Sequence, residues 1–239
     1  MNKIMKSHTD SDKQEEKVTS VVNRRYFLRS AGLATSMGAI VLGACKDDDP
    51  AVIPGTGDAV DLGSGDIGVL NYAYALEQLE AAFYAQVITT PYTGMSDTEK
   101  TILTDIRDHE IIHRDFFKAA LGDKAIKGLT PNFSTIDFSS RTSVLGAAKL
   151  FEDTGVAAYN GAGKLIKNAE YLLLAGKIVS VEARHAAVIR DLINPKTMDF
   201  AGDDIINADG FDKATAPADI LNAVKGFVRD TITGASVGK

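Results

Sequence analysis

The chain of 239 residues carries 26 Lys or Arg and 32 Asp or Glu, which gives a net charge of −6 at pH 7. This acidic balance argues against nucleic acid or an anionic membrane surface as a binding partner. The single cysteine excludes an intrachain disulfide, so a folded core must rest on apolar packing.

The first 45 residues are typical of an export signal. Arg24 and Arg25 stand before a Tyr-Phe-Leu-Arg sequence, and a run rich in Gly and Ala follows from Ala31 to Ala44. That run is too short and too weakly apolar to span a bilayer, so we interpret it as the apolar part of a signal. The paired arginines resemble a twin-arginine signal, which implies that the protein is exported.

Cys45 follows directly after Leu-Gly-Ala, a sequence that resembles a lipobox. The resemblance implies lipidation of Cys45 and anchoring by acyl chains, with the protein in the periplasm or on the cell surface. The alternative is an ordinary small residue late in a signal. The acidic run Asp47–Asp49 fits either a surface-export signal or the start of a linker. Residues 46–65 are rich in Asp, Gly and Pro, which predicts a flexible linker.

The remaining residues, 66–239, are predicted to form one all-α domain. Apolar residues recur at steps of three and four in four segments that are each long enough for a helix, and sustained period-two patterns are lacking. A capping box of Ser96 and Glu99 opens the second segment, and Pro195 follows the fourth. The four predicted helices span about 66–89, 96–122, 141–166 and 168–192.

The connections between these segments predict the topology. The links at 90–95 and at 167 are short, so each should join two antiparallel neighbours, whereas 122–140 is long enough for a crossover. Pro217 opens a short apolar-periodic segment that reaches Val228. The sequence therefore predicts a four-helix bundle of two antiparallel hairpins joined by a long crossover, with a short C-terminal helix.

The two halves of this domain repeat one pattern of metal-ligand residue types. In each half, one predicted helix carries a Glu and the next carries Glu-x-x-His, whose two side chains point the same way. Burying four carboxylates on apolar faces would be very costly without cations to compensate their charge. This set is the ligand set of a dinuclear metal site inside a helical bundle. The candidate ligands are Glu77, Glu110, His113, Glu152, Glu182 and His185.

Glu80 is an alternative to Glu77, because it lies one helical turn further along the same segment. Aligning the two halves favours Glu77, since the residue that then matches Glu80 is Gly155. Carboxylates with one imidazole per ion suit iron or manganese better than copper or structural zinc, and no thiolate is present in the predicted domain to favour a softer metal.

Several residues close to the candidate ligands have open assignments. Tyr84 and Tyr159, each seven residues after the first Glu of its half, fit either hydrogen-bond partners of the carboxylates or core aromatics. His109 could contact a ligand side chain or lie at the rim of the site, but we expect it to be a surface histidine. Asp108 and Asp153 adjoin ligands and are at most candidates for hydrogen bonds to them.

From residue 66 to residue 228 the chain resembles the ferritin-like superfamily. It looks most like exported bacterial ferritin-like domain proteins, with rubrerythrin and bacterioferritin as distant relatives. The resemblance implies two iron or manganese ions, with Glu110 and Glu182 bridging them and Glu77 and Glu152 as terminal ligands. It also implies a reaction with oxygen or peroxide, in oxidative stress or iron oxidation, and it is compatible with a homodimer.

The resemblance leaves the reaction open. No Cys-x-x-Cys pair is present, so peroxidase turnover of the rubrerythrin type would need an external reductant. The alternative is a non-catalytic envelope protein, with a binding or structural role, that uses the ferritin-like bundle as a scaffold.

Overall fold

A computed structural model describes residues 59–239. The predicted signal, Cys45 and most of the predicted linker lie outside the described residues. Within the described part, no helix is long and apolar enough to cross a membrane. Four long helices make up most of the domain: α2 (Gly65–Thr89), α3 (Asp97–Leu121), α4 (Arg141–Gly163) and α5 (Ala169–Ile193).

The shorter elements lie before, between and after these helices. The predicted short C-terminal helix is present as α6, and its first residue is Pro217, as the sequence indicated. The all-α prediction is confirmed, with two-residue strands as the only exception among residues 59–239. The shorter elements are β1 (Val60–Asp61), η1 (Gly122–Lys124), η2 (Met198–Ala201), α6 (Pro217–Val224), η3 (Lys225–Phe227) and β2 (Ile232–Thr233).

Local signals account for where the long helices begin and end. The Ser96 side chain accepts from the Glu99 amide while the Glu99 carboxylate accepts from Ser96, which satisfies the first amides of α3. Asn168 caps α5 with a single bond, because its side-chain oxygen accepts from the Glu170 amide. Helix α4 ends at Gly163 and not at the predicted residue 166. The amides of Leu165 and Ile166 bond to carbonyls three residues earlier, which is turn geometry and not α-helix geometry.

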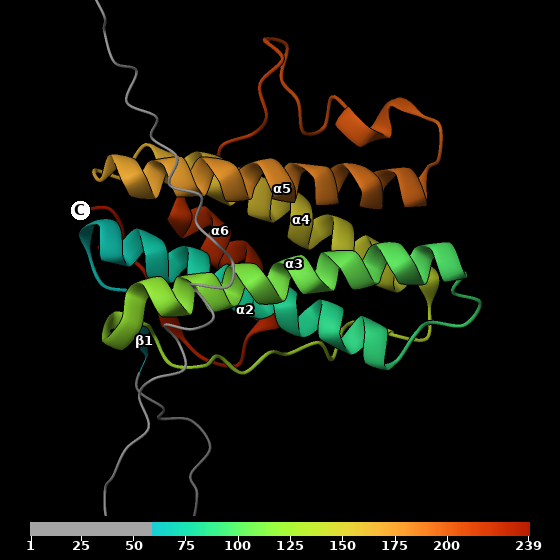
Figure 1. Ribbon diagram of the computed structural model, residues 1–239, viewed down its shortest axis with the longest axis horizontal. Helices are drawn as coiled ribbons and strands as arrows, with labels where there is room; N and C mark the ends of the chain where they lie inside the picture. The colour runs from blue at the N-terminus through green and yellow to red at the C-terminus, as the bar shows by residue number, and fades with distance from the viewer. Residues whose placement is uncertain (1–58) are drawn as a thin grey trace, which may run out of the picture. The chain divides into compact units, whose positions relative to one another are not determined.

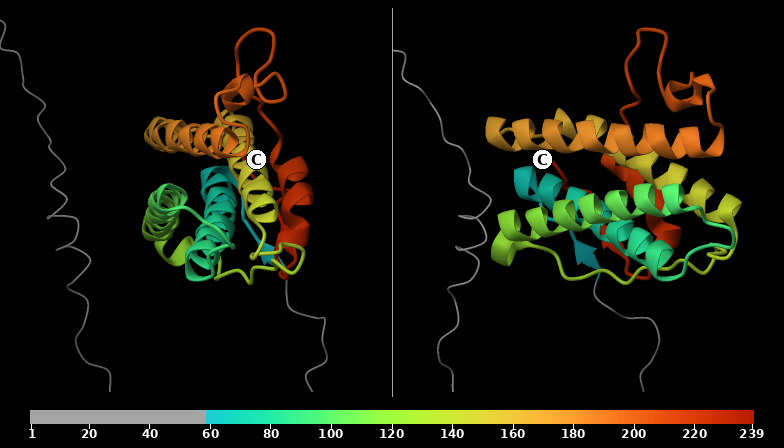
Figure 2. Two further views of the ribbon diagram at one scale, coloured as in Figure 1. Left: turned by 90° about the vertical axis from the view of Figure 1, so that its right-hand side faces the viewer. Right: turned by 45° about the vertical axis from the view of Figure 1, so that its right-hand side comes forward.

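The long helices form two hairpins, as predicted. Helix α2 packs mainly on α3, and α4 packs mainly on α5 (Figure 1). The chain between η1 and α4 runs back along the length of the bundle, so it is the crossover that joins the hairpins. Seen along the bundle, the two hairpins lie one above the other and α6 packs against their side (Figure 2). The centre of the bundle is therefore enclosed by all four long helices.

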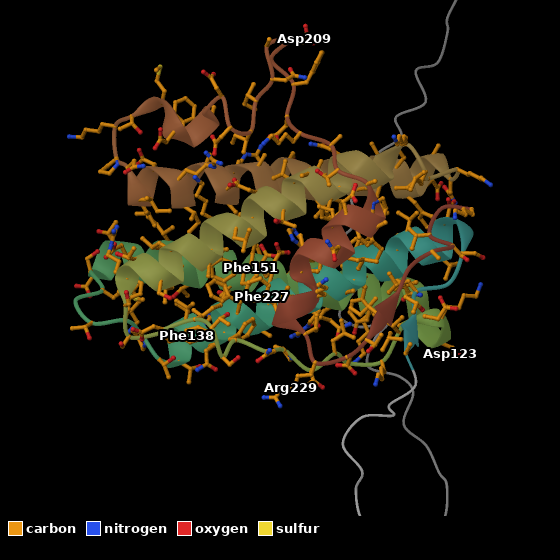
Figure 3. The ribbon with its side chains drawn as sticks, turned by 180° about the vertical axis from the view of Figure 1, so that it is seen from behind. Asp123, Phe138, Phe151, Asp209, Phe227 and Arg229 are labelled. Atoms are coloured by element: carbon orange, nitrogen blue, oxygen red, sulfur yellow. The ribbon has the colours of Figure 1, made fainter. Side chains whose placement is uncertain are left out.

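Helix α2 lies deepest, with 16 of its 25 residues buried. An aromatic cluster covers one end of it and also holds the crossover and η3 in place. Phe83 on α2 contacts Phe151 on α4 at 5.0 Å between ring centroids, and Phe151 contacts Phe227 on η3 at 4.9 Å (Figure 3). Phe133 and Phe138 of the crossover also pack on Phe83. These ring contacts fasten the crossover and the C-terminal segment to the bundle.

The two short strands join the beginning and the end of the domain. β1 pairs with β2 in parallel, with Val60 opposite Ile232 and Asp61 opposite Thr233. Leu62, directly after β1, is fully buried in the core. Strands of two residues are too short for an alternating pattern, so no sequence signal marks them.

A long excursion between α5 and α6, residues 194–216, is held to the bundle by a buried arginine. The side chain of Arg190 is 2% exposed and forms two hydrogen bonds to Asp153 on α4 and two to Asp204 in the excursion. It also donates to the Asp199 carbonyl. These partners compensate the buried charge and tie α4, α5 and the excursion together.

The excursion returns to the bundle across the face of α4, where the backbones meet at Gly161. The Thr215 amide donates to the Ala157 carbonyl at 2.9 Å. A Cβ atom at Gly161 would lie 1.8 Å from the Thr215 carbonyl oxygen. The segment can therefore dock only on a glycine.

We predict that Gly161→Ala lowers the free energy of unfolding by about 1–3 kcal/mol, because the backbone at Thr215 must move away. Gly146→Ala, on the same helix with nothing near the added methyl group, should instead raise stability by up to about 1 kcal/mol. Urea unfolding of both variants measures the difference. Equal stability of the two variants would contradict the docking role of Gly161.

Candidate metal centre

The six candidate ligands converge in the middle of the bundle, although they come from four helices. Helices α2 and α4 contribute Glu77 and Glu152, and α3 and α5 contribute one Glu-x-x-His pair each. All four carboxylates are fully buried, and His185 is 4% exposed. The structure thus brings together the whole set that the sequence pattern singled out.

The converging residues form two overlapping sets of four. Within each set, every residue offers one ligand atom, and these atoms lie within 4.8 Å of one another. Glu110 and Glu182 belong to both sets. The family resemblance implies bridging ligands at these same two residues. Donor set A is Glu77, Glu110, His113 and Glu182; donor set B is Glu110, Glu152, Glu182 and His185.

Distances between individual atoms assign each oxygen to one set. In set A, the Nδ1 atom of His113 lies 2.9 Å from Glu182 Oε1 and 3.8 Å from Glu110 Oε2. In set B, the Nδ1 atom of His185 lies 2.8 Å from Glu110 Oε1 and 3.9 Å from Glu182 Oε2. Each shared carboxylate therefore turns one oxygen toward each histidine.

These close atoms do not hydrogen-bond to one another. Eight buried atoms that could ligate a metal form no hydrogen bond in the two sets. They are both oxygens of each shared carboxylate, one oxygen of Glu77 and one of Glu152, and the Nδ1 atoms of both histidines. Buried polar atoms are normally hydrogen-bonded, so eight atoms without a hydrogen bond in one place need an explanation. Atoms that approach within 3 Å without aiming at each other are oriented toward shared points between them.

The remaining oxygens of the two unshared carboxylates are held by tyrosines. The Tyr84 hydroxyl donates to Glu152 Oε1 at 2.5 Å, and the Tyr159 hydroxyl donates to Glu77 Oε1. Each bond crosses between the hairpins, since Tyr84 lies on α2 and Glu152 on α4, while Tyr159 lies on α4 and Glu77 on α2. Of the two interpretations of these tyrosines, the structure supports hydrogen bonding to the carboxylates. Each unshared carboxylate keeps one free oxygen, which points into its donor set.

Electrostatics keeps protons in this cluster when no cation is present. Burial raises the pKa of Glu77 to about 8, and it also raises that of Glu182 far above its usual range. Burial by itself would lower the histidine pKa values, but the surrounding carboxylates outweigh it and raise His113 to about 12 and His185 to about 10. The two imidazolium groups in turn hold the pKa of Glu110 at about 2, against the effect of burial.

Two neighbouring residues, His109 and Glu80, take positions that the sequence left open. His109 is exposed, as expected, but its Nδ1 atom also lies 2.9 Å from Nε2 of His185, in hydrogen-bond geometry. Glu80 is buried yet belongs to neither donor set, whereas Glu77 does. The Glu80 carboxylate occupies space that Gly155 leaves free, where a Cβ would lie 3.0 Å from its oxygen.

The two aspartates next to candidate ligands bond elsewhere. Asp108 pairs with Arg107 at the surface, and Asp153 pairs with Arg190 beneath the excursion. Neither forms a hydrogen bond to a candidate ligand within residues 59–239. No motif marks the contact between His109 and His185, because the two residues are 76 positions apart on different helices.

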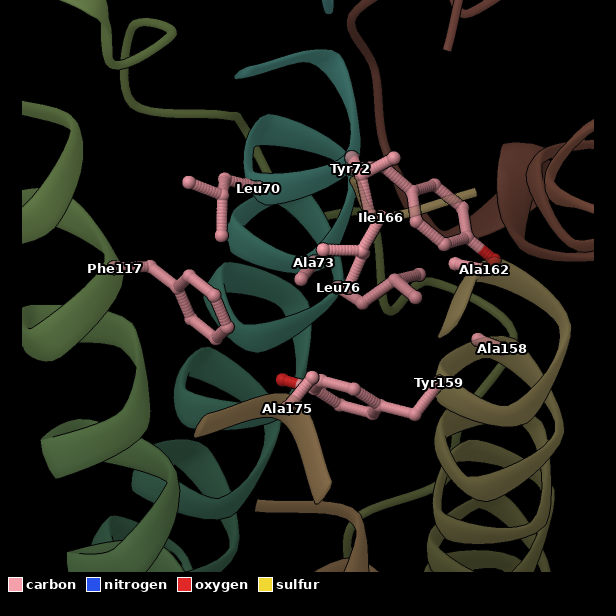
Figure 4. A pocket seen from close by; sticks show the side chains of 11 residues that line it. Leu70, Tyr72, Ala73, Leu76, Phe117, Ala158, Tyr159, Ala162, Ile166 and Ala175 are labelled. Carbon is pink, nitrogen blue, oxygen red and sulfur yellow. The ribbon is translucent and has the colours of Figure 1, made fainter. Parts of the chain in front are cut away.

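An apolar pocket adjoins donor set A (Figure 4). Tyr159 lies across one side of it and turns its hydroxyl to Glu77, and Ala73 lies one helical turn before Glu77. The cavity measures about 20 Å³, where one water needs roughly 10–15 Å³. Apart from the hydroxyls of Tyr72 and Tyr159, the side chains that line it are hydrocarbon. It has room for a very small molecule and offers little hydrogen bonding.

We predict that uptake of a divalent metal releases protons and becomes tighter as the pH rises from about 6 to 8. The raised pKa values leave His113, His185 and Glu77 protonated near neutrality, and a metal must displace these protons. Calorimetric titration with Mn²⁺ in two buffers of different ionisation heat measures the released protons. Binding without proton release, at an affinity independent of pH, would contradict the prediction.

Comparison with known proteins places this geometry in context. A family model described as a ferritin-like domain matches residues 65–195, which is more than half of the chain. The matched span contains the four long helices and all six candidate ligands. No curated protein matches the chain.

Proposed function

Since the chain belongs to the ferritin-like family, we propose that its six converging side chains hold two iron or manganese ions that react with dioxygen or peroxide. The observation that carries this proposal is the set of eight buried atoms that form no hydrogen bond and converge in two groups. They divide into two groups of three oxygens and one nitrogen, one group for each donor set. Two divalent cations would give every one of these atoms a partner.

The donor atoms favour particular metals. Each set offers three carboxylate oxygens and one imidazole nitrogen, and neither set contains a thiolate. Such oxygen-rich sets suit iron or manganese, whereas structural zinc and copper sites use more nitrogen or sulfur. Bound iron or manganese would supply the redox chemistry that reduces an oxidant.

The residues of the chain would prepare the site for that chemistry. The hydroxyls of Tyr84 and Tyr159 fix the unshared carboxylates, so that each presents a single free oxygen. The enclosing helices exclude bulk water from the four buried carboxylates, which strengthens their attraction for cations. The raised histidine pKa values mean that protons leave when cations enter.

The pocket beside donor set A favours dioxygen among the oxidants. Its lining gives a polar molecule such as peroxide few partners, whereas an uncharged diatomic molecule needs none. Ala175 and Ile166 are the partly exposed residues of its lining, and we infer that dioxygen enters beside Ala175. Electrons would return from an external reductant, because the chain has only one cysteine and therefore no dithiol pair.

The proposed location rests on residues outside the described part of the chain. The twin-arginine pattern at Arg24 and Arg25 and the lipobox-like sequence ending at Cys45 support export and a lipid anchor. We therefore propose that the domain works in the periplasm or at the cell surface. Mass spectrometry of Cys45 in membrane fractions tests the anchor independently of the metal centre.

We predict about two iron or manganese ions per chain in protein purified from its own export pathway, with absorption that changes on oxidation. Glu110→Ala and His185→Ala should both lose metal, and both should melt below the parent, because a metal that binds only the folded state stabilises it. Asp115→Asn, an exposed change on the same helix as Glu110, is the control and should keep both ions. Unchanged metal content in Glu110→Ala would refute the site.

A metal-replete protein that reacts with neither oxidant would favour the non-catalytic alternative. The decisive experiment is anaerobic loading with Fe²⁺, followed by stopped-flow mixing with dioxygen or with hydrogen peroxide. Oxidation of both ions within seconds would support a redox role. Full metal content with no oxidation over hours would leave a binding or structural role.

We predict that Ala175→Phe slows oxidation by dioxygen several-fold without lowering metal content, because the larger side chain fills the entrance of the pocket. Leu173→Phe, on the same helix but outside this pocket, is the matched control. Stopped-flow absorption of the Fe²⁺-loaded variants measures the rates. Equal rates in the two variants would exclude this route.

A further inference from the structure

The two donor sets are related by the repeat of the halves, but their histidines have different surroundings. In set B, Nδ1 of His185 faces the carboxylates, and Nε2 on the other side of the ring meets Nδ1 of His109 at 2.9 Å. The two imidazole planes lie within 9° of each other. This bond holds the His185 ring in one orientation.

Set A has no counterpart to this bond. His109 lies four residues before His113, and the matching position in the other half, four before His185, is Val181. A valine side chain neither donates nor accepts a hydrogen bond. Within residues 59–239, His113 forms no hydrogen bond through its second ring nitrogen, and its side chain is 12% exposed. Only the carboxylates at Nδ1 and the packing around it therefore orient the His113 ring.

The bond also fixes which nitrogen of His185 is available to a cation. A histidine that binds a metal through Nδ1 carries its remaining proton on Nε2. Nε2–H of His185 can then donate to Nδ1 of His109, while His109 keeps its own proton on the outer nitrogen. Such a partner keeps the remaining proton on Nε2 when a metal displaces the proton from Nδ1, and it fixes the direction in which Nδ1 points.

We propose that His109 makes donor set B the tighter of the two metal positions, so that the ions bind in order, B before A. This inference rests on the proposed metal centre. It makes His109 a positioning residue that acts through His185. The weaker position A is the one next to the apolar pocket, because Tyr159 lines the pocket and also holds Glu77 of set A.

Titration of the metal-free protein with Co²⁺, followed by calorimetry and by visible absorption, tests the order of binding. The parent protein should bind two Co²⁺ ions in two separate steps. His109→Ala should weaken the tighter step by roughly 10–100-fold, the usual cost of losing a partner behind a ligating histidine, and change the weaker step little. His109→Asn should restore much of the loss, since its side-chain oxygen can accept from Nε2 of His185.

Val181→Ala is the matched control, because it changes the corresponding position in the other half and should leave both steps unaltered. Thermal melting of the metal-free variants checks that His109→Ala folds like the parent. Two Co²⁺ ions bound in indistinguishable steps, or equal weakening of both steps in His109→Ala, would overturn the inference and leave the metal centre standing. If the parent bound no Co²⁺, the metal centre itself would be refuted together with this inference.

Discussion

Four carboxylates without exposed surface share the centre of one helical bundle, and their mutual repulsion constrains the rest of the domain. Each has lost its hydration, and like charges in a dry interior repel strongly. In the metal-free protein the charge is offset by protons, chiefly those held on His113 and His185. The apolar packing around the cluster must then hold the helices together against this repulsion.

Contacts that cross between the hairpins hold the four helices together against this repulsion. Each hairpin packs mainly within itself, so few contacts force the two to meet at a defined distance. The bonds from Tyr84 to Glu152 and from Tyr159 to Glu77 do so at the centre. Arg190 does not cross between the hairpins, because it joins α4, α5 and the excursion within the second hairpin. The two tyrosine bonds, together with apolar contacts such as Phe83 on Phe151, therefore set the relative position of the hairpins.

Much of this arrangement could be predicted from the sequence, since its signals are local or repeated. Apolar periodicity and caps such as Ser96 locate the helices to within a few residues, and the repeat of the halves selects Glu77 over Glu80, in agreement with the geometry. A single Glu-x-x-His would not have been specific. The matched second copy is what makes the pattern informative.

The features that the sequence did not predict depend on contacts between distant elements. The bond between His109 and His185 joins α3 to α5, and periodicity within one helix carries no information about the facing helix. The Glu80 side chain has room in the core because a glycine lies opposite it on α4. The role of Asp153 depends on Arg190, which no nearby motif connects to it.

The crossed tyrosine bonds have a consequence for the order of folding. A hairpin folding by itself would carry a Glu-x-x-His pair and a third Glu, but the tyrosine that orients that Glu belongs to the other hairpin. Neither half can therefore complete its own ligand set before the two hairpins dock. The mature cluster should form in a late step of folding, when the crossover has closed. A chain caught earlier would offer cations only partial, poorly ordered sets of ligands.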